Sequence, residues 1–262
     1  MTISDDSKVV NTWRRRFDVI AVFVHFVLIA IIIARLDLDN GDPTVSHTTR
    51  TRVALILLVE IVSFVFHVWV WAGWLLVPSS RLARFVPDWK TEPWNRFKWA
   101  EYAITATAGT ISVALSGNSG VSSIPQIIVL SIGGIAQQWC GYTLDGIATS
   151  KEDVTLHTRS FIFGALSQVV EFIILIFWVE VDVEGPLFWI YGVMWSSFGV
   201  IAYARLRQEL RLSFAKDDVL FFAADEPTTG PLAILELSEM WYSLMGWVSK
   251  LAVGLATLYV PE

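Results

Sequence analysis

The chain has 262 residues, of which 54% are hydrophobic and only 17% are charged, and its mean hydropathy is +0.55. This composition excludes an ordinary soluble domain and indicates an integral, multi-pass protein of the cell membrane, with the lipid bilayer as its surroundings. The formal net charge of −6 is too small to indicate a nucleic-acid partner, and the single cysteine, Cys140, excludes an intrachain disulfide framework.

Seven apolar segments are long enough to cross a hydrocarbon core of about 30 Å, which takes roughly 20 helical residues. In chain order they lie near 16–35, 53–77, 95–116, 124–148, 160–181, 187–208 and 232–259. Pro125, Pro186 and Pro231 fall at helix starts, and Pro78 follows the second segment. We therefore expect an all-α membrane protein, with residues 1–262 forming a single seven-transmembrane-helix bundle rather than a barrel.

The connection between the first two spans, residues 35–47, contains the pair Asn40-Gly41, which is a strong turn signal. The alternation on both sides of this pair allows a short β-hairpin over the outer face. An irregular polar loop fits the same residues equally well.

The basic residues predict how the bundle is oriented. Fifteen of the nineteen lysines and arginines lie before the first span or around the connections after the second, fourth and sixth spans. By the positive-inside rule, the amino terminus is cytoplasmic and the carboxyl terminus is extracellular.

Lys250 stands within the apolar stretch 244–253 of the seventh span, where a charge costs at least a few kcal/mol unless it is paired, neutralised or modified. A desolvated lysine is suited to forming a Schiff base with a carbonyl cofactor. Glu101 of the third span lies within a few ångström of the lysine tip in depth, because helical side chains lean towards the amino terminus. Glu101 is therefore the expected counterion of a modified lysine. A conventional ion pair that ties two helices together is the other interpretation.

Five further ionisable residues are candidates for proton transfer. His25 and His67 lie at related depths in the first and second spans, and Glu60 shares a helix face with His67. Glu239 lies eleven residues before the buried lysine on nearly the same face, and Glu171 sits in the middle of the fifth span without an obvious cation. Hydrogen-bonded contacts between helices are the simpler interpretation of the histidines.

Aromatic residues near the expected site are the last candidates. Trp195 and Phe198 lie in the middle of the sixth span, and Gly246, Trp247 and Ser249 flank the lysine. These aromatic residues predict either a rigid slot around a bound cofactor or ordinary packing and interfacial anchoring.

These features together carry a resemblance to a known family. They are the third-span stretch Asn95-Arg96-Phe97-Lys98-Trp99-Ala100-Glu101-Tyr102, the pair Ser249-Lys250, the two histidines His25 and His67, and the inverted orientation. The chain resembles the heliorhodopsins over essentially its whole length. The resemblance implies all-trans retinal linked to Lys250, Glu101 as the Schiff-base counterion, and a homodimer with the first outer loop at its interface.

The same resemblance implies a photochemical function rather than an enzymatic one. A light-absorbing photoreceptor would move a proton transiently to a cluster of His25, His67 and water on the cytoplasmic side, and an unknown signalling partner would sense the change. The additional acids Glu60 and Glu171 leave open a light-driven or light-gated proton conductor. A transporter or structural membrane protein without retinal is a more distant alternative. The chain departs from the family pattern at Gly246, where a serine is expected one turn before the lysine.

Overall fold

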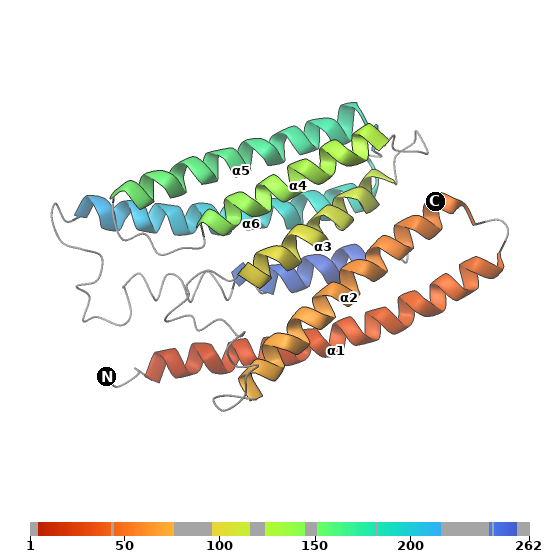
Figure 1. Ribbon diagram of the computed structural model, residues 1–262, viewed down its shortest axis with the longest axis horizontal. Coiled ribbons are helices and arrows are strands. Elements are labelled where there is room, and N and C mark those ends of the chain that lie inside the picture. Colours follow the sequence, from red (N-terminus) through yellow and green to blue (C-terminus); the bar gives the residue numbers. More distant parts are fainter. Residues whose placement is uncertain are drawn as a thin grey trace.

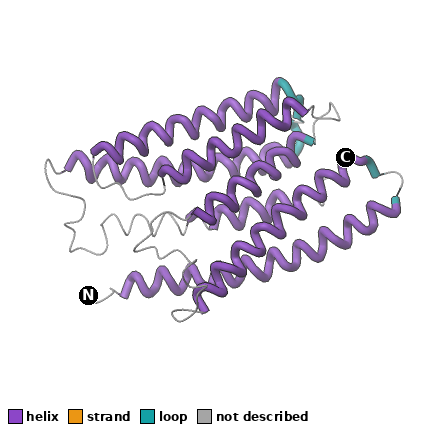
Figure 2. Tube along the Cα trace, in the orientation of Figure 1, coloured by secondary structure: helices purple, strands orange, loops and turns teal. Residues whose placement is uncertain are grey.

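The computed structural model describes residues 5–42, 45–75, 96–115, 124–144, 151–181, 183–215, 241–242 and 244–255. Its helices are α1 (Asp5–Gly41), α2 (His47–Leu75), α3 (Arg96–Ala114), α4 (Ile124–Leu144), α5 (Lys151–Phe177) and α6 (Pro186–Ala215). A further helical segment, which we call the seventh helix, covers Leu244–Leu255. The described residues contain helices and short connections but no strand (Figure 2). The expected all-α bundle is thus confirmed for this part of the chain.

The helices lie side by side along the long axis of the molecule (Figure 1). Helices α4, α5 and α6 form one side and α1 and α2 the other, and α3 and the seventh helix lie between them. Helices that follow one another from α1 to α6 pack together, and α3 also contacts α6. This arrangement places α3 and the seventh helix at the centre, where side chains from both sides can meet.

Local sequence signals explain several helix ends. The Ser46 hydroxyl accepts the backbone N–H of Thr49 at 3.1 Å, which caps the first turn of α2. Pro186 is the first residue of α6, a position where its missing N–H has no intrahelical partner in any case. Helix α5 ends where Glu180 takes a positive φ of 55° and the N–H of Val181 donates to the carbonyl of Leu175.

The predicted spans identify the helices, but several boundaries differ. Helix α1 begins at Asp5 rather than 16 and ends at Gly41 rather than 35, α2 begins at His47, α5 begins at Lys151, and α6 continues to Ala215. The physical reason is that hydropathy detects only the apolar part of a helix, whereas backbone hydrogen bonding continues into polar residues. The ends of the predicted second, fourth and seventh spans lie partly outside the described residues.

The short hairpin that the sequence allows in the first outer loop, with Asn40-Gly41 as its turn, is not formed. Residues 35–41, including Asn40-Gly41, are the last turns of α1. Helix α2 begins only a few residues later, which leaves no length for two strands. The guanidinium of Arg50 donates to the carbonyl of Asp42 at 2.7 Å and holds this short connection against the start of α2.

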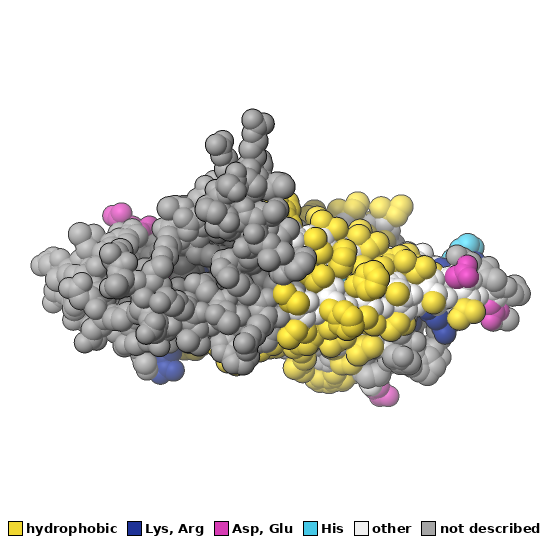
Figure 3. Space-filling view, turned by 90° about the horizontal axis from the view of Figure 1, so that it is seen from below, with side chains coloured by type: hydrophobic (Ala, Val, Ile, Leu, Met, Phe, Trp, Pro, Cys, Tyr) yellow, Lys and Arg dark blue, Asp and Glu magenta, His cyan; other side chains and the backbone are white. Residues whose placement is uncertain are grey.

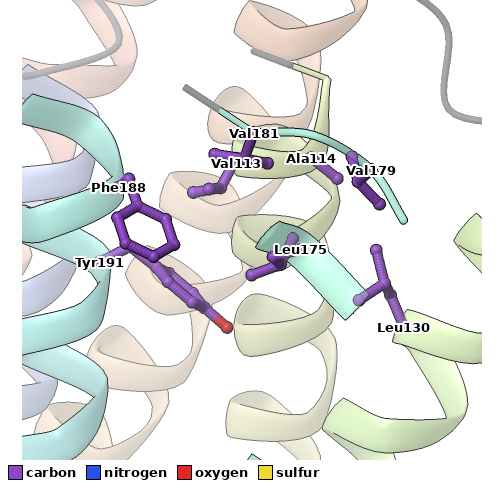
Figure 4. Close-up of a cluster of buried hydrophobic side chains, with 8 residues drawn as sticks. All are labelled: Val113, Ala114, Leu130, Leu175, Val179, Val181, Phe188 and Tyr191. Atoms are coloured by element: carbon purple, nitrogen blue, oxygen red, sulfur yellow. The ribbon is translucent and has the colours of Figure 1, made fainter. Parts of the chain in front are cut away.

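Two apolar clusters form the interior. One lies near the ends of α3 and α5 and the starts of α4 and α6, and its side chains converge in Figure 4; it consists of Val113, Ala114, Leu130, Leu175, Val179, Val181, Phe188 and Tyr191. The other joins α1 to α2 and consists of Leu28, Ile32, Val53 and Ile56, with Leu251 and Val253 of the seventh helix packed against it.

Large apolar side chains also cover the outside of the bundle. Phe23, Phe163 and Phe177 are 67%, 68% and 77% exposed, and hydrophobic side chains cover much of the described part of the face in Figure 3. Among the described residues, four stretches are long and apolar enough to cross a membrane: Val19–Leu38, His47–Val70, Ile124–Leu144 and Glu152–Phe177. An exposed surface of this extent is expected where helices face lipid.

Candidate functional site

The centre of the site is a buried ion pair between the seventh helix and α3. Lys250 is 9% exposed and Glu101 is 4% exposed, and the lysine Nζ donates a hydrogen bond to Glu101 Oε1. The Ser63 hydroxyl of α2 donates to the same oxygen at 2.7 Å. A buried pair of this kind is costly to break, by about 3–5 kcal/mol, because the remaining charge loses its partner. The expected convergence of the two side chains is therefore present.

Tyr102 supports this pair from α3. The lysine Nζ lies 5.1 Å from the centre of its ring, within the range of a cation–π interaction. Its hydroxyl donates to the backbone carbonyl of Tyr242 at 3.0 Å and so ties α3 to the residues that precede the seventh helix. A Cβ atom at Gly246 would lie 2.8 Å from this hydroxyl oxygen. Glycine at this position is therefore what lets the tyrosine approach the seventh helix.

A second buried group joins α1 to α2 beside the ion pair. His25 Nδ1 and Glu60 Oε2 are 2.5 Å apart, and both side chains are completely buried. The His25 ring stacks on His67 with 5.5 Å between ring centres. Glu60 Oε1 would lie 3.3 Å from a Cβ atom at Gly254, which places this carboxylate against the seventh helix. The structure thus brings the two predicted histidines and Glu60 together.

A cavity opens beside Lys250 and is lined by α2, α3, α4, α5, α6 and the seventh helix. Its volume is about 170 Å³, roughly ten times what one water molecule needs. Its wall is mainly apolar and aromatic and includes Trp195, Phe198, Gly246 and Ser249. Trp247, in contrast, does not line the cavity, and its indole N–H has no hydrogen-bond partner among the described residues.

A polar network lies along another part of the cavity wall. Gln137 of α4 donates to Glu171 Oε2 at 2.8 Å and accepts the indole N–H of Trp195 at 2.6 Å. The hydroxyl groups of Thr110 and Tyr191 are 2.7 Å apart. Glu171 is therefore bonded to an amide, and no described contact joins it to Lys250 or Glu101.

A buried ionic cluster links α5 to α6. His157 Nδ1 lies 2.8 Å from Glu209 Oε2, and the guanidinium of Arg205 donates to Glu209 Oε1 at 3.2 Å. Within the described part of the chain, no group of three or more histidine, cysteine, aspartate or glutamate side chains could hold a metal ion.

The structure brings some of the predicted site residues together and separates others from them. Lys250, Glu101, His25, His67 and Glu60 lie in one region, Glu171 lies in a different network, and Glu239 falls outside the described residues. The sequence analysis missed Ser63 as a partner of the carboxylate. Ser63 lies three residues after Glu60 and four before His67, so helical spacing alone could have placed it on the same face of α2.

The geometry defines a helical membrane protein in which a buried lysine–carboxylate pair borders a largely apolar cavity. The family model described as heliorhodopsin matches residues 15–213, and the chain belongs to that family. Membership implies a retinal chromophore in a photoreceptor-like rhodopsin. No curated protein matches the chain. The matched region includes Glu101 and both histidines but ends before Lys250, so the place of the lysine beside them comes from the structure.

Proposed function

We propose that this protein is a light-absorbing photoreceptor in which Lys250 holds all-trans retinal as a Schiff base and Glu101 is the counterion. The observation that carries the proposal is a lysine that lines a largely apolar cavity and whose amine is hydrogen-bonded to a buried carboxylate. The bound retinal supplies absorption of visible light and an isomerisation that follows it. The cavity fits such a group because its wall is mainly aromatic and apolar and includes Lys250.

The side chains around the lysine nitrogen have separate tasks in this proposal. Glu101 stabilises the positive charge on the nitrogen, because an uncompensated cation is costly in a low-dielectric interior. Ser63 fixes one carboxylate oxygen by its hydrogen bond, and the ring of Tyr102 presents its face to the charge. Trp195 and Phe198 form part of the rigid wall that orients the bound group.

When the pairing with Glu101 weakens, the nitrogen loses its proton to the neighbouring polar group formed by His25, His67 and water on the cytoplasmic side. The stacked histidines support this step, since imidazole accepts and returns protons near neutral pH. Glu239 is a further candidate by its position in the sequence. Return of the proton to the nitrogen closes the cycle without net transport, which is the behaviour of a sensor rather than of an enzyme.

The surroundings of the protein follow from the same argument. We place it in the cell membrane with a cytoplasmic amino terminus, because most basic residues lie on that side. A homodimer with the first outer loop at its interface, and an unknown signalling partner, are expected from the family and complete the proposal.

Purification in the presence of all-trans retinal tests this function. We expect a visible absorption band that disappears in Lys250→Ala and persists in Lys98→Arg, which alters another buried lysine, 2% exposed, that does not line the cavity. After borohydride reduction, the retinyl group should map to the peptide containing Lys250. Absence of any band, or a band that survives in Lys250→Ala, would favour a permanent ion pair in a transporter or structural protein.

A proton conductor is the second candidate, and the buried Glu60 beside the seventh helix is the observation that favours it. Glu171 supports it less, because this acid belongs to the network of Gln137 and Trp195. Current recordings under voltage clamp separate the two functions. Reproducible photocurrents would rule out the pure sensor, and their absence at every potential would rule out the conductor.

A further inference from the structure

The His25–Glu60 pair is a buried acid–base pair that the packing of two helices holds in place. It is formed by two different helices, both side chains are completely buried, and the imidazole Nδ1 lies 2.5 Å from the carboxylate Oε2. The second atom of each group, His25 Nε2 and Glu60 Oε1, is buried without a hydrogen-bond partner among the described residues. Two basic positions are thus available for a proton in an interior that otherwise penalises unpaired polar atoms.

The pair also lies against the helix that carries the lysine. Gly254 is four residues beyond Lys250, or about 6 Å farther along the seventh helix. A Cβ atom at Gly254 would lie only 3.3 Å from Glu60 Oε1. The missing side chain at this position therefore lets the carboxylate approach the backbone of the seventh helix about one turn beyond the lysine.

Glu60 and Glu101 differ in a way that matters for storing a proton. Glu101 Oε1 already accepts hydrogen bonds from Lys250 and Ser63, so a proton placed on this carboxylate stays in contact with the nitrogen that released it. Glu60 has no described contact with the lysine amine, and it is held by His25 instead. A proton on Glu60 is therefore separated from its origin while remaining within the same buried region.

We propose that Glu60 is the carboxylate that receives the proton leaving the Lys250–Glu101 pair, with His25 holding it in position. This inference rests on the proposed function. In the step, an N–H bond at the Lys250 nitrogen breaks and an O–H bond forms at Glu60 Oε1, whose carboxylate belongs to the same buried group as His25 and His67. The net charge of the buried region does not change, because the nitrogen loses one positive charge and the Glu60 group gains one.

Light-minus-dark infrared spectroscopy of the full chain with retinal, in lipid, tests the transfer. We expect a new carbonyl band of a protonated carboxylic acid that is present in the wild type, lost in Glu60→Gln and retained in Glu171→Gln. The Glu171 variant is the matched control, because it removes another buried carboxylate bonded to Gln137. A band that survives in Glu60→Gln, or that is lost only in Glu101→Gln, overturns the proposal.

Two conservative variants keep the test decisive if Glu60→Gln does not fold. Glu60→Asp retains a carboxylic acid and should shift the frequency of the band, and Gly254→Ala should shift it by crowding Oε1. An unchanged frequency in both variants would show that the band arises from another residue.

The pair itself can be tested without retinal. In ¹⁵N-histidine spectra of the retinal-free protein, the His25 ring signals should move in Glu60→Gln and stay in place in Glu171→Gln. If Glu60→Gln leaves the His25 signals unchanged, the two side chains do not form a pair, even if the protein absorbs light. If no visible band forms with retinal, the proposed function and the transfer both fail, whereas the histidine spectra still decide whether the pair exists.

Discussion

Replacing Gly246 by alanine tests the packing of α3 against the seventh helix. The new Cβ would lie 2.8 Å from the Tyr102 hydroxyl oxygen and 3.3 Å from the ring carbon that bears it. Overpacking of a filled interior costs about 1–3 kcal/mol, and loss of the hydrogen bond to Tyr242 adds about 0.5–1.5 kcal/mol. Alanine in place of glycine in a helix returns about 1 kcal/mol. We therefore expect Gly246→Ala to lower the free energy of unfolding by about 0.5–3.5 kcal/mol.

The assay is unfolding of the purified protein in detergent micelles, with Gly133→Ala as the control. Gly133 lies in helix α4 with no atom near its would-be Cβ, so alanine there should be neutral or stabilising. Tyr102→Phe removes the atom at 2.8 Å but leaves the ring carbon at 3.3 Å, so Gly246→Ala should cost less in the Tyr102→Phe background. Equal costs in both backgrounds, or a Gly246→Ala variant as stable as Gly133→Ala, would refute the steric argument.

Three further predictions concern the Lys250–Glu101 pair and the cluster of His157, Arg205 and Glu209. Glu101→Gln should move the visible band to longer wavelength, because the positive charge on the nitrogen loses its anion; an unmoved band in the absorption spectrum would identify another counterion. Ser63→Ala should move the band to shorter wavelength, since Glu101 loses a competing donor and interacts more strongly with the cation, and a shift in the opposite direction would contradict this reasoning. Glu209→Ala should lower the free energy of unfolding by about 3–5 kcal/mol, because Arg205 and His157 both lose their carboxylate partner, and a loss below about 1 kcal/mol would mean that the cluster is hydrated.

The helical fold could be predicted from the sequence because a long apolar run has few alternatives to a membrane-spanning helix. The helix ends could not, since they depend on local hydrogen bonds. The turn signal of Asn40-Gly41 was overridden because α1 continues through it, and the cap formed by Ser46 sets the start of α2 instead. The prediction also left out the polar first turns of α5, from Lys151 onwards, because a helical backbone does not end where its side chains become charged.

The ion pair was predictable because it depends mainly on depth, and residue number converts directly into depth along a helix of known rise. Contacts that depend on how each helix is rotated about its axis could not be predicted from the sequence. The sequence placed Glu60 on the face of His67, but its partner is His25 on another helix. Glu171 has no evident cation in the sequence because its partner is the Gln137 amide, which carries no charge.

Three of the nine buried side-chain polar atoms without a hydrogen-bond partner among the described residues belong to acid or base groups near Lys250. Glu101 Oε2, Glu60 Oε1 and His25 Nε2 are buried without hydrogen-bond partners among the described residues, and each such atom costs about 1–3 kcal/mol unless water or a proton satisfies it. A protein selected only for stability would satisfy these atoms with protein donors, as Ser63 does for Glu101 Oε1. Because all three belong to acid or base groups gathered around one buried lysine, their cost is consistent with sites that a proton or water occupies in turn. Under the proposed function, these atoms are the ones that a proton-transfer cycle would use.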